Sequence, residues 1–184
     1  MQKTLQQTDP ITGLVAADHS TGAAHGAVLL LEYGDYECPS CCEAEPVTRY
    51  LMEAFFNRMR FVFRHFPLVE VHPHAELAAE ATEAAAAQDK FWEMHHQLFT
   101  HSQHLKPDSL THYAEAIGLD MRRFGAEMAD RIYLQRVQEH RRAGEQLGLR
   151  SSPSFFLNGK VVDVSFGLEH LEHAVRAALG ESAP

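Results

Sequence analysis

The order of apolar and polar positions predicts a β–α–β unit in the N-terminal third of the chain. Residues 28–33 form a short, nearly continuous apolar run, which is typical of a buried strand. Apolar side chains then recur every three or four residues in the segment 39–57, and this spacing predicts an amphipathic helix with a kink at Pro46. Residues 59–64 predict a second strand, reached by a right-handed crossover.

The rest of the chain divides into a block of helices and a β-hairpin. Helical periodicity marks four segments: 75–87, 91–99, 109–117 and 131–147. Asn158-Gly159 then separates two short β-type runs, 154–157 and 160–164, and predicts a tight hairpin. A closing helix is expected over 168–179. These elements together predict an α/β fold.

Composition and charge limit the classes of function. A chain of 184 residues with 45% hydrophobic and 22% charged residues suits one globular domain. No apolar run approaches the roughly 20 residues of a membrane span, so we expect no membrane partner. The net charge of −9 argues against nucleic acid, whose phosphates it would repel. The first 26 residues lack the pattern of a secretion signal, so we expect a cytoplasmic protein.

The three cysteines lie close together, at Cys38, Cys41 and Cys42, so they cannot form a framework of distant structural disulfides. The Cys38-Pro-Ser-Cys41 spacing falls where a strand meets a helix, the context in which it most strongly indicates redox chemistry. A thiol at a helix N-terminus has a lowered pKa, because unpaired N–H groups and the helix dipole stabilise its thiolate. We therefore expect Cys38 to be the nucleophile and Cys41 to resolve its mixed disulfides.

The cysteine spacing by itself leaves open a metal site and the role of Cys42. The cysteines and a histidine could hold zinc or copper, although His72, His74, His95 and His96 are not linked to them by sequence. Cys42, four residues after the nucleophile, is interpreted first as a small packed residue and second as an alternative resolving or regulatory thiol.

Several short motifs in a fixed order carry a resemblance to a known family. In chain order they are Glu32-Tyr-Gly-Asp-Tyr-Glu-Cys38-Pro-Ser-Cys41, Glu45-Pro46, Phe63-Arg-His-Phe-Pro67, His72-Pro-His-Ala75, Phe91-Trp-Glu-Met-His95 and Ser152-Pro153-Ser-Phe-Phe-Leu-Asn-Gly159. From about Asp18 to Leu179 the sequence resembles the DsbA-like thioredoxin-fold thiol:disulfide oxidoreductases, in particular their leaderless bacterial branch. The resemblance implies a thioredoxin fold with an all-helical insertion. The expected division is an extension at 1–25, a thioredoxin-like domain at 26–66 and 149–180, and the insertion at 67–148.

The resemblance also implies roles for particular residues. Ser152-Pro153 matches the family's cis-proline loop, which lies beside the cysteines and docks the backbone of a substrate peptide. Pro39 and Ser40, between the cysteines, are expected to face substrate as well. Glu32 matches a buried acid that exchanges protons with the resolving cysteine. A carboxylate in an apolar strand supports this role, and the alternative is an exposed strand face.

The sequence departs from the family pattern at the dithiol. Pro-Ser between the cysteines supplies no cation for the Cys38 thiolate, and four nearby acids are expected to raise its pKa: Asp35, Glu37, Glu43 and Glu45. Ser152 stands where the family usually has Thr or Val. We therefore expect a milder oxidant than the periplasmic enzymes.

The hypothesis that follows is a thiol–disulfide oxidoreductase that acts through Cys38 and Cys41 on protein or small thiols. It needs no metal or organic cofactor beyond the Cys38–Cys41 disulfide, and glutathione or a thioredoxin-like reductant would recycle it. Net reductase or isomerase activity is favoured, because the cytosol resupplies electrons. The alternatives are a Cys/His metal-binding or redox-sensing module, and a glutathione-transferase or isomerase type of enzyme, which the intact cysteine pair disfavours.

Overall fold

The structure is a computed structural model that describes residues 13–15 and 18–181, and its strands form one five-stranded sheet. The strand order is β1-β3-β2-β4-β5. Their bounds are β1 His19–Gly22, β2 Val28–Gly34, β3 Met59–His65, β4 Ser154–Leu157 and β5 Lys160–Val162. β1 pairs antiparallel with β3, and β4 pairs antiparallel with β5.

Seven helices lie within the described residues, five of them between β3 and β4. Their bounds are α1 Pro39–Ala54, α2 Ala75–Ala86, α3 Phe91–Thr100, α4 Pro107–Ala116, α5 Met121–Ala129, α6 Leu134–Gln146 and α7 Glu169–Ala178. The α/β fold with an all-helical insertion is confirmed. None of the described helices is both long enough and apolar enough to cross a membrane.

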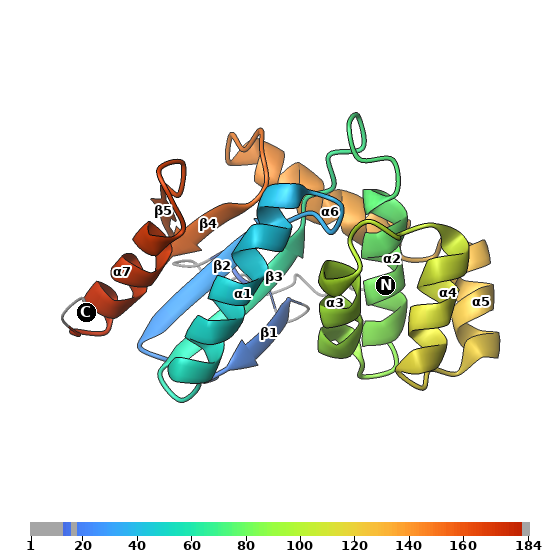
Figure 1. Ribbon diagram of the computed structural model, residues 1–184, viewed down its shortest axis with the longest axis horizontal. Coiled ribbons are helices and arrows are strands. Elements are labelled where there is room, and N and C mark those ends of the chain that lie inside the picture. The colour runs from blue at the N-terminus through green and yellow to red at the C-terminus, as the bar shows by residue number, and fades with distance from the viewer. Residues whose placement is uncertain (1–12, 16–17, 182–184) are drawn as a thin grey trace, which may run out of the picture. The chain divides into compact units, whose positions relative to one another are not determined.

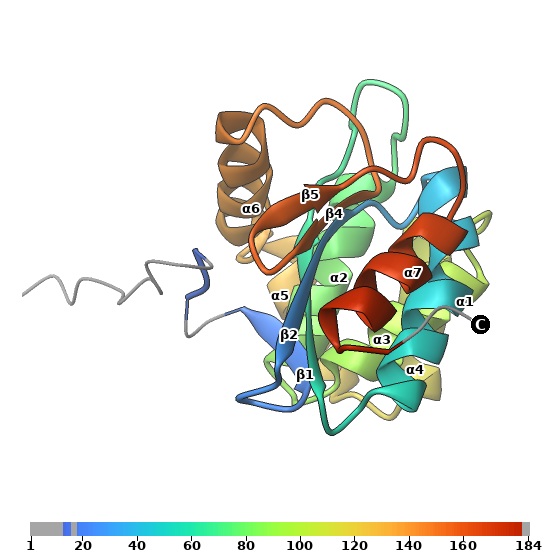
Figure 2. The ribbon, with the colours of Figure 1, turned by 90° about the vertical axis from the view of Figure 1, so that its left-hand side faces the viewer.

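The chain forms two compact units, and the first comprises the described residues of the ranges 1–32, 47–64 and 154–184. It contains nearly all of the sheet. The second half of α1 and α7 lie on one face of that sheet (Figures 1 and 2). Side chains such as Leu30, Phe61 and Phe155 are fully buried in its core, as the apolar runs predict.

The second unit comprises residues 33–46 and 65–153, so it joins the five helices to the segment that carries the cysteines. The alanine-rich α2 is its centre and contacts α3, α4, α5 and α6. Ala78, Ala81 and Ala84 are fully buried there. Small side chains let helices approach closely, which explains the alanine run as packing.

The structure differs from the predicted elements in two places. Residues 19–22, placed by sequence in an N-terminal extension, form β1, and the rest of the predicted extension up to residue 17 lies mostly outside the described residues. α5 was not predicted as a separate helix. The compact units also divide the chain differently, because the helical unit takes in residues 33–46 and 149–153.

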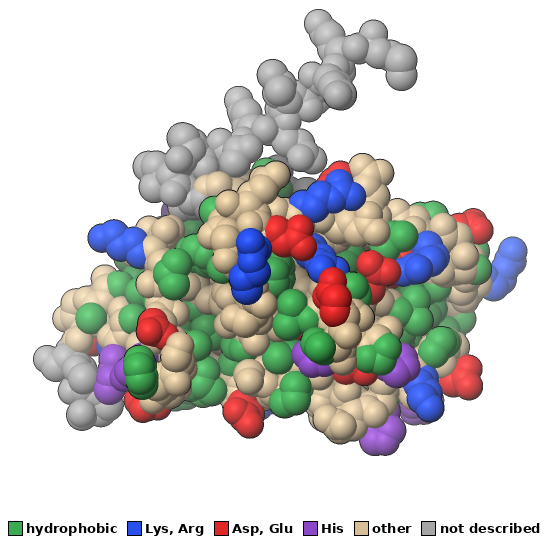
Figure 3. All heavy atoms as spheres, turned by 90° about the horizontal axis from the view of Figure 1, so that it is seen from above, with side chains coloured by type: hydrophobic (Ala, Val, Ile, Leu, Met, Phe, Trp, Pro, Cys, Tyr) green, Lys and Arg blue, Asp and Glu red, His purple; other side chains and the backbone are tan. Residues whose placement is uncertain are grey.

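On the face drawn in Figure 3, Lys and Arg side chains are interspersed with Asp and Glu and form no continuous basic patch.

Candidate active site

The dithiol lies at the start of α1, where the sequence places it. Cys38 immediately precedes the first helical residue, Pro39, and Cys41 lies one turn further along. Both cysteines are buried, Cys38 with 6% of its surface exposed and Cys41 with none. All three cysteines are free thiols, while Pro39 and Ser40 between the pair are exposed.

The Cys38 thiol has a pKa lowered to about 5. The largest cause is a hydrogen bond from the Cys41 side chain, and burial of the sulfur opposes it. Ser152 and hydrogen bonds from the backbone at Cys41 and Ser40 lower the pKa further. Cys38 is therefore a thiolate at neutral pH, as a nucleophile needs to be.

The loop before β4 contacts the nucleophile directly. In its protonated form the Cys38 thiol donates to the backbone carbonyl of Ser152, with 3.4 Å between Sγ and the oxygen. The Ser152–Pro153 peptide bond is cis. Ser152 is buried and Pro153 is half-buried. The structure thus places the two residues implied by resemblance at the reactive sulfur.

Asp35 organises the turn that precedes the dithiol. Its carboxylate is fully buried and accepts hydrogen bonds from the backbone N–H groups of Glu37, at 2.8 Å, and Leu68, at 2.9 Å. The same carboxylate lies 2.8 Å from His72 Nδ1. The Asp35 backbone N–H donates to Cys41 Sγ at 3.4 Å. One residue therefore links a histidine to the resolving thiol.

The other two residues of this turn also contact histidines. Glu37 Oε1 lies 2.8 Å from His74 Nδ1, and Glu37 Oε2 accepts the His74 backbone N–H at 2.6 Å. The Tyr36 hydroxyl lies 3.0 Å from His95 Nδ1. Sequence reasoning considered these histidines only as candidate metal ligands and missed their contacts with the turn, because each pair joins residues 37 or 59 positions apart.

These contacts change the electrostatic expectation for Cys38. The acids before and after the cysteines were expected to raise its pKa, yet it is lowered, and hydrogen bonds dominate the shift. Asp35 and Glu37 each have an imidazole partner, and Glu45 lies 3.6 Å from His96 Nδ1. Counting acids along the sequence overlooked this pairing.

Cys42 differs from its neighbours in both exposure and ionisation. It is half-buried, and its pKa is raised, chiefly by burial and further by the charges of Cys38 and Asp35. Its thiol lies 3.9 Å from the carbonyl oxygen of Tyr36. A thiol with a raised pKa is a poor nucleophile, which favours its interpretation as a packing residue.

Glu32 lies in β2 and is 2% exposed, so the alternative of an exposed strand face is wrong. It belongs to the first compact unit, whereas Cys41 belongs to the second. Its role in proton exchange stays a prediction.

A separate group of ligand-type side chains lies in the helical unit. Among the described residues, the ligand atoms of His65, Glu83 and His140 lie within 4.8 Å of one another, and no cysteine belongs to this group. Arg136 pairs with Glu83 at 2.9 Å, and the two imidazole rings stack at 28°. Two ring nitrogens of the group also have protein partners, because His65 Nε2 lies 2.9 Å from Glu83 Oε1 and His140 Nδ1 accepts the His65 backbone N–H at 3.3 Å.

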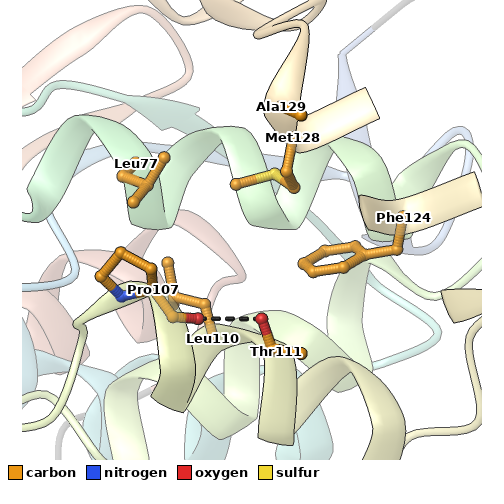
Figure 4. Close-up of a pocket in the computed structure, with 7 residues that line it drawn as sticks. All are labelled: Leu77, Pro107, Leu110, Thr111, Phe124, Met128 and Ala129. Carbon is orange, nitrogen blue, oxygen red and sulfur yellow. Dashed lines mark hydrogen bonds between the residues drawn. The ribbon is translucent and has the colours of Figure 1, made fainter. Parts of the chain in front are cut away.

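The helical unit also contains an apolar cavity of about 300 Å³ between α2, α4 and α5 (Figure 4). Leu77, Leu110, Phe124 and Met128 line it, and neither cysteine does. It is thus separate from the dithiol chemistry.

The chemistry available at the dithiol is disulfide exchange. A thiol that is ionised at neutral pH and a second thiol one turn along the helix form and break a disulfide with a partner. This architecture and the Cys38–Cys41 dithiol define the class of protein, a thioredoxin-type α/β fold with an all-helical insertion.

Comparison with known proteins identifies the family. The family model described as Thioredoxin matches residues 15–177, so the chain belongs to the thioredoxin family. Two curated relatives are similar in sequence. The Na(+)/H(+) antiporter NhaA 1 of Salinispora arenicola is 44% identical over 88% of this chain and 24% of its own. The NhaA 3 antiporter of Salinispora tropica is 41% identical over 90% and 25%. The chain thus spans about a quarter of the length of these relatives.

Solved structures share the fold. Oxidised BdbD from Bacillus subtilis superposes with a TM-score of 0.79 at 20% identity, over 89% of this chain and 93% of that one. A thioredoxin-like oxidoreductase from Silicibacter pomeroyi gives 0.77 at 25% identity, over 90% and 94%. The α-DsbA2 protein of Wolbachia pipientis gives 0.77 at 19% identity, over 88% and 87%.

Proposed function

We propose that this protein exchanges disulfides with protein thiols in the cytoplasm and acts there mainly as a reductase or isomerase. The observation that carries the proposal is the ionised, buried Cys38 with Cys41 as its hydrogen-bond donor. The Cys38 thiolate attacks a substrate disulfide, forms a mixed disulfide and releases one substrate thiolate. Cys41 then attacks the Cys38 sulfur, which forms the Cys38–Cys41 disulfide and releases the second substrate thiol, so two electrons pass to the substrate.

The pKa of Cys38 supports the proposed direction. At about 5 it lies between the values of about 7 for thioredoxin and about 3.5 for DsbA. A more stable thiolate stabilises the reduced state and makes the disulfide more oxidising. We therefore expect a potential between those of thioredoxin and DsbA, near that of glutaredoxins and isomerases. Such a dithiol is kept largely reduced by a cytosolic glutathione pool, which would serve as the electron donor.

The experiment is a redox titration of the purified protein in glutathione buffers, with thiol alkylation and mass spectrometry to locate the disulfide. A reversible Cys38–Cys41 bond is expected in the wild type and in Cys42→Ser, and none in Cys38→Ser. In cells, trapping with an alkylating agent should find the pair mostly reduced. Absence of a reversible Cys38–Cys41 bond would overturn the proposal, and a mostly oxidised pair in cells would overturn its direction and compartment.

The antiporter relatives favour a second proposal about the partner. Proteins 41–44% identical to this chain over about a quarter of their length carry the name Na(+)/H(+) antiporter. We propose that the oxidoreductase works beside such a membrane antiporter. A Cys41→Ser, Cys42→Ser variant, which retains mixed disulfides on Cys38, should yield an adduct that mass spectrometry identifies as the antiporter when the two are co-expressed. Recovery of only soluble adducts would contradict this partner.

A further inference from the structure

The turn before the dithiol carries two carboxylates, and each is bound by one histidine of the segment 68–74. Asp35 Oδ2 lies 2.8 Å from His72 Nδ1, and Glu37 Oε1 lies 2.8 Å from His74 Nδ1. An ionised carboxylate only accepts hydrogen bonds, so both imidazoles must carry their proton on Nδ1 and donate it. In each pair, therefore, the imidazole is the hydrogen-bond donor and the carboxylate is the acceptor.

Of the two carboxylates, that of Asp35 is the more deeply buried and depends more on its partners. Its carboxylate has no exposed surface, whereas 20% of the Glu37 side chain is exposed. Besides His72, the Asp35 carboxylate is held by the backbone N–H groups of Glu37 and Leu68. A buried charge that loses one partner is poorly compensated, so the turn would shift to reach water or other donors.

A shift of the turn would act on the resolving thiol. The Asp35 N–H donates to Cys41 Sγ at 3.4 Å, and a donated N–H stabilises negative charge on that sulfur. The Asp35 carbonyl accepts the Cys38 backbone N–H at 3.2 Å, so the turn also sets the start of the helix. The charge of Asp35 also reaches the half-buried Cys42.

We propose that His72 is a positioning residue for the second chemical step, because it compensates Asp35 and so holds the Asp35 N–H on Cys41. This inference rests on the proposed dithiol exchange. In that step the Cys41 thiolate attacks Cys38 in the mixed disulfide, the Cys38–Cys41 bond forms, and the partner leaves as a thiolate.

Other ionisable groups surround the same turn. Tyr36, between the two carboxylates, contacts His95, and Glu45 on α1 lies 3.6 Å from His96. Because His95 contacts Tyr36 and His96 contacts Glu45, a change at His72 isolates the Asp35 pair.

The test follows the two steps separately with Ellman's reagent, in a Cys42→Ala background so that only two thiols react. Cys38 attacks and releases one coloured thiolate, and Cys41 then releases the second. His72→Ala should slow the second release at least about tenfold, since a hydrogen bond to a charged group is worth that much. The first release should change by less than about threefold.

Three further variants separate positioning from loss of structure. His72→Asn keeps an N–H donor and should restore the second release to within about threefold of the wild-type rate. In an Asp35→Asn background, His72→Ala should have little added effect, because the charge to be compensated is gone. His112→Ala, an exposed histidine on α4, is the matched control and should leave both releases unchanged.

Two outcomes would overturn the inference: a normal second release in His72→Ala, or an equal slowing in the Asp35→Asn background. Circular dichroism and thermal melting of each variant check that it is folded. If His72→Ala does not fold, the comparison of His72→Asn with the wild type still tests the inference. If the parent protein with Cys42→Ala released only one coloured thiolate, the proposed function itself would fail.

Discussion

Removal of the Cys41 thiol is expected to raise the pKa of Cys38. The side chain of Cys41 is the largest cause of the lowered value of about 5. A hydrogen bond to a charged group contributes about 1.5–3 kcal/mol, and one pKa unit corresponds to about 1.4 kcal/mol. Cys41→Ala should therefore place the pKa of Cys38 between about 6 and 7, whereas Cys41→Ser keeps a donor and should stay near the wild-type value.

The change is largest when it is measured near pH 6. There a pKa of about 5 leaves about 90% of Cys38 as thiolate, while a pKa of about 6.5 leaves about 25%. Because only the thiolate reacts, the pH at which alkylation of Cys38 by iodoacetamide reaches half its plateau rate should move from about 5 to between about 6 and 7 in Cys41→Ala. Its rate should fall with decreasing pH around each midpoint, and the thiolate absorbance gives the midpoint independently. Equal midpoints in the Ala and Ser variants would refute the reasoning, because the donor would then have no effect.

Three further expectations concern the potential, the third cysteine and the packing beneath the site. The reduction potential at pH 7 should lie near about −200 mV by equilibration with glutathione, and a value below about −260 mV or above about −140 mV would contradict the assignment from the pKa of Cys38. Cys42→Ala should change the rate of disulfide exchange by less than about twofold in an insulin reduction assay, and a larger loss would make Cys42 a participant. Gly144→Ala should lower the free energy of unfolding by about 1–3 kcal/mol, because the added methyl group would lie 2.7 Å from the ring of Phe66. A urea titration measures this change, and an unchanged midpoint would mean that the ring moves aside at no cost.

The elements with a strong local pattern could be predicted from sequence, and two weakly patterned ones could not. β1 has four residues, all half-exposed, and becomes a strand only because it pairs with β3. α5 is short and has Phe124 as its one fully buried residue. The sequence does contain one signal for this helix, because Asp is a favoured N-cap residue. In the structure Asp120 caps α5 and accepts the backbone N–H groups of Arg122 and Arg123.

In the candidate site, too, only the residues with a local sequence pattern could be predicted. Cys38 and Cys41 follow from spacing and from their place between strand and helix, both of which are local. Asp35 and His72 are 37 residues apart, and only the folded chain brings them together. The pKa of Cys38 is lowered chiefly by the hydrogen bond from Cys41 and not raised by the neighbouring acids, so counting charges along the sequence gave a misleading expectation.

The hairpin between β4 and β5 anchors the sheet through a residue outside both strands. Asn158 accepts the Leu29 backbone N–H on its side-chain oxygen and donates its own N–H to the Leu29 carbonyl, each at 2.8 Å. Asn158 and Gly159 both have positive φ, as a two-residue turn of this kind needs. A residue inserted into this turn would carry Asn158 away from Leu29 and remove both bonds at once. Protein engineers who wish to attach a tag or a reporter should therefore avoid this tip.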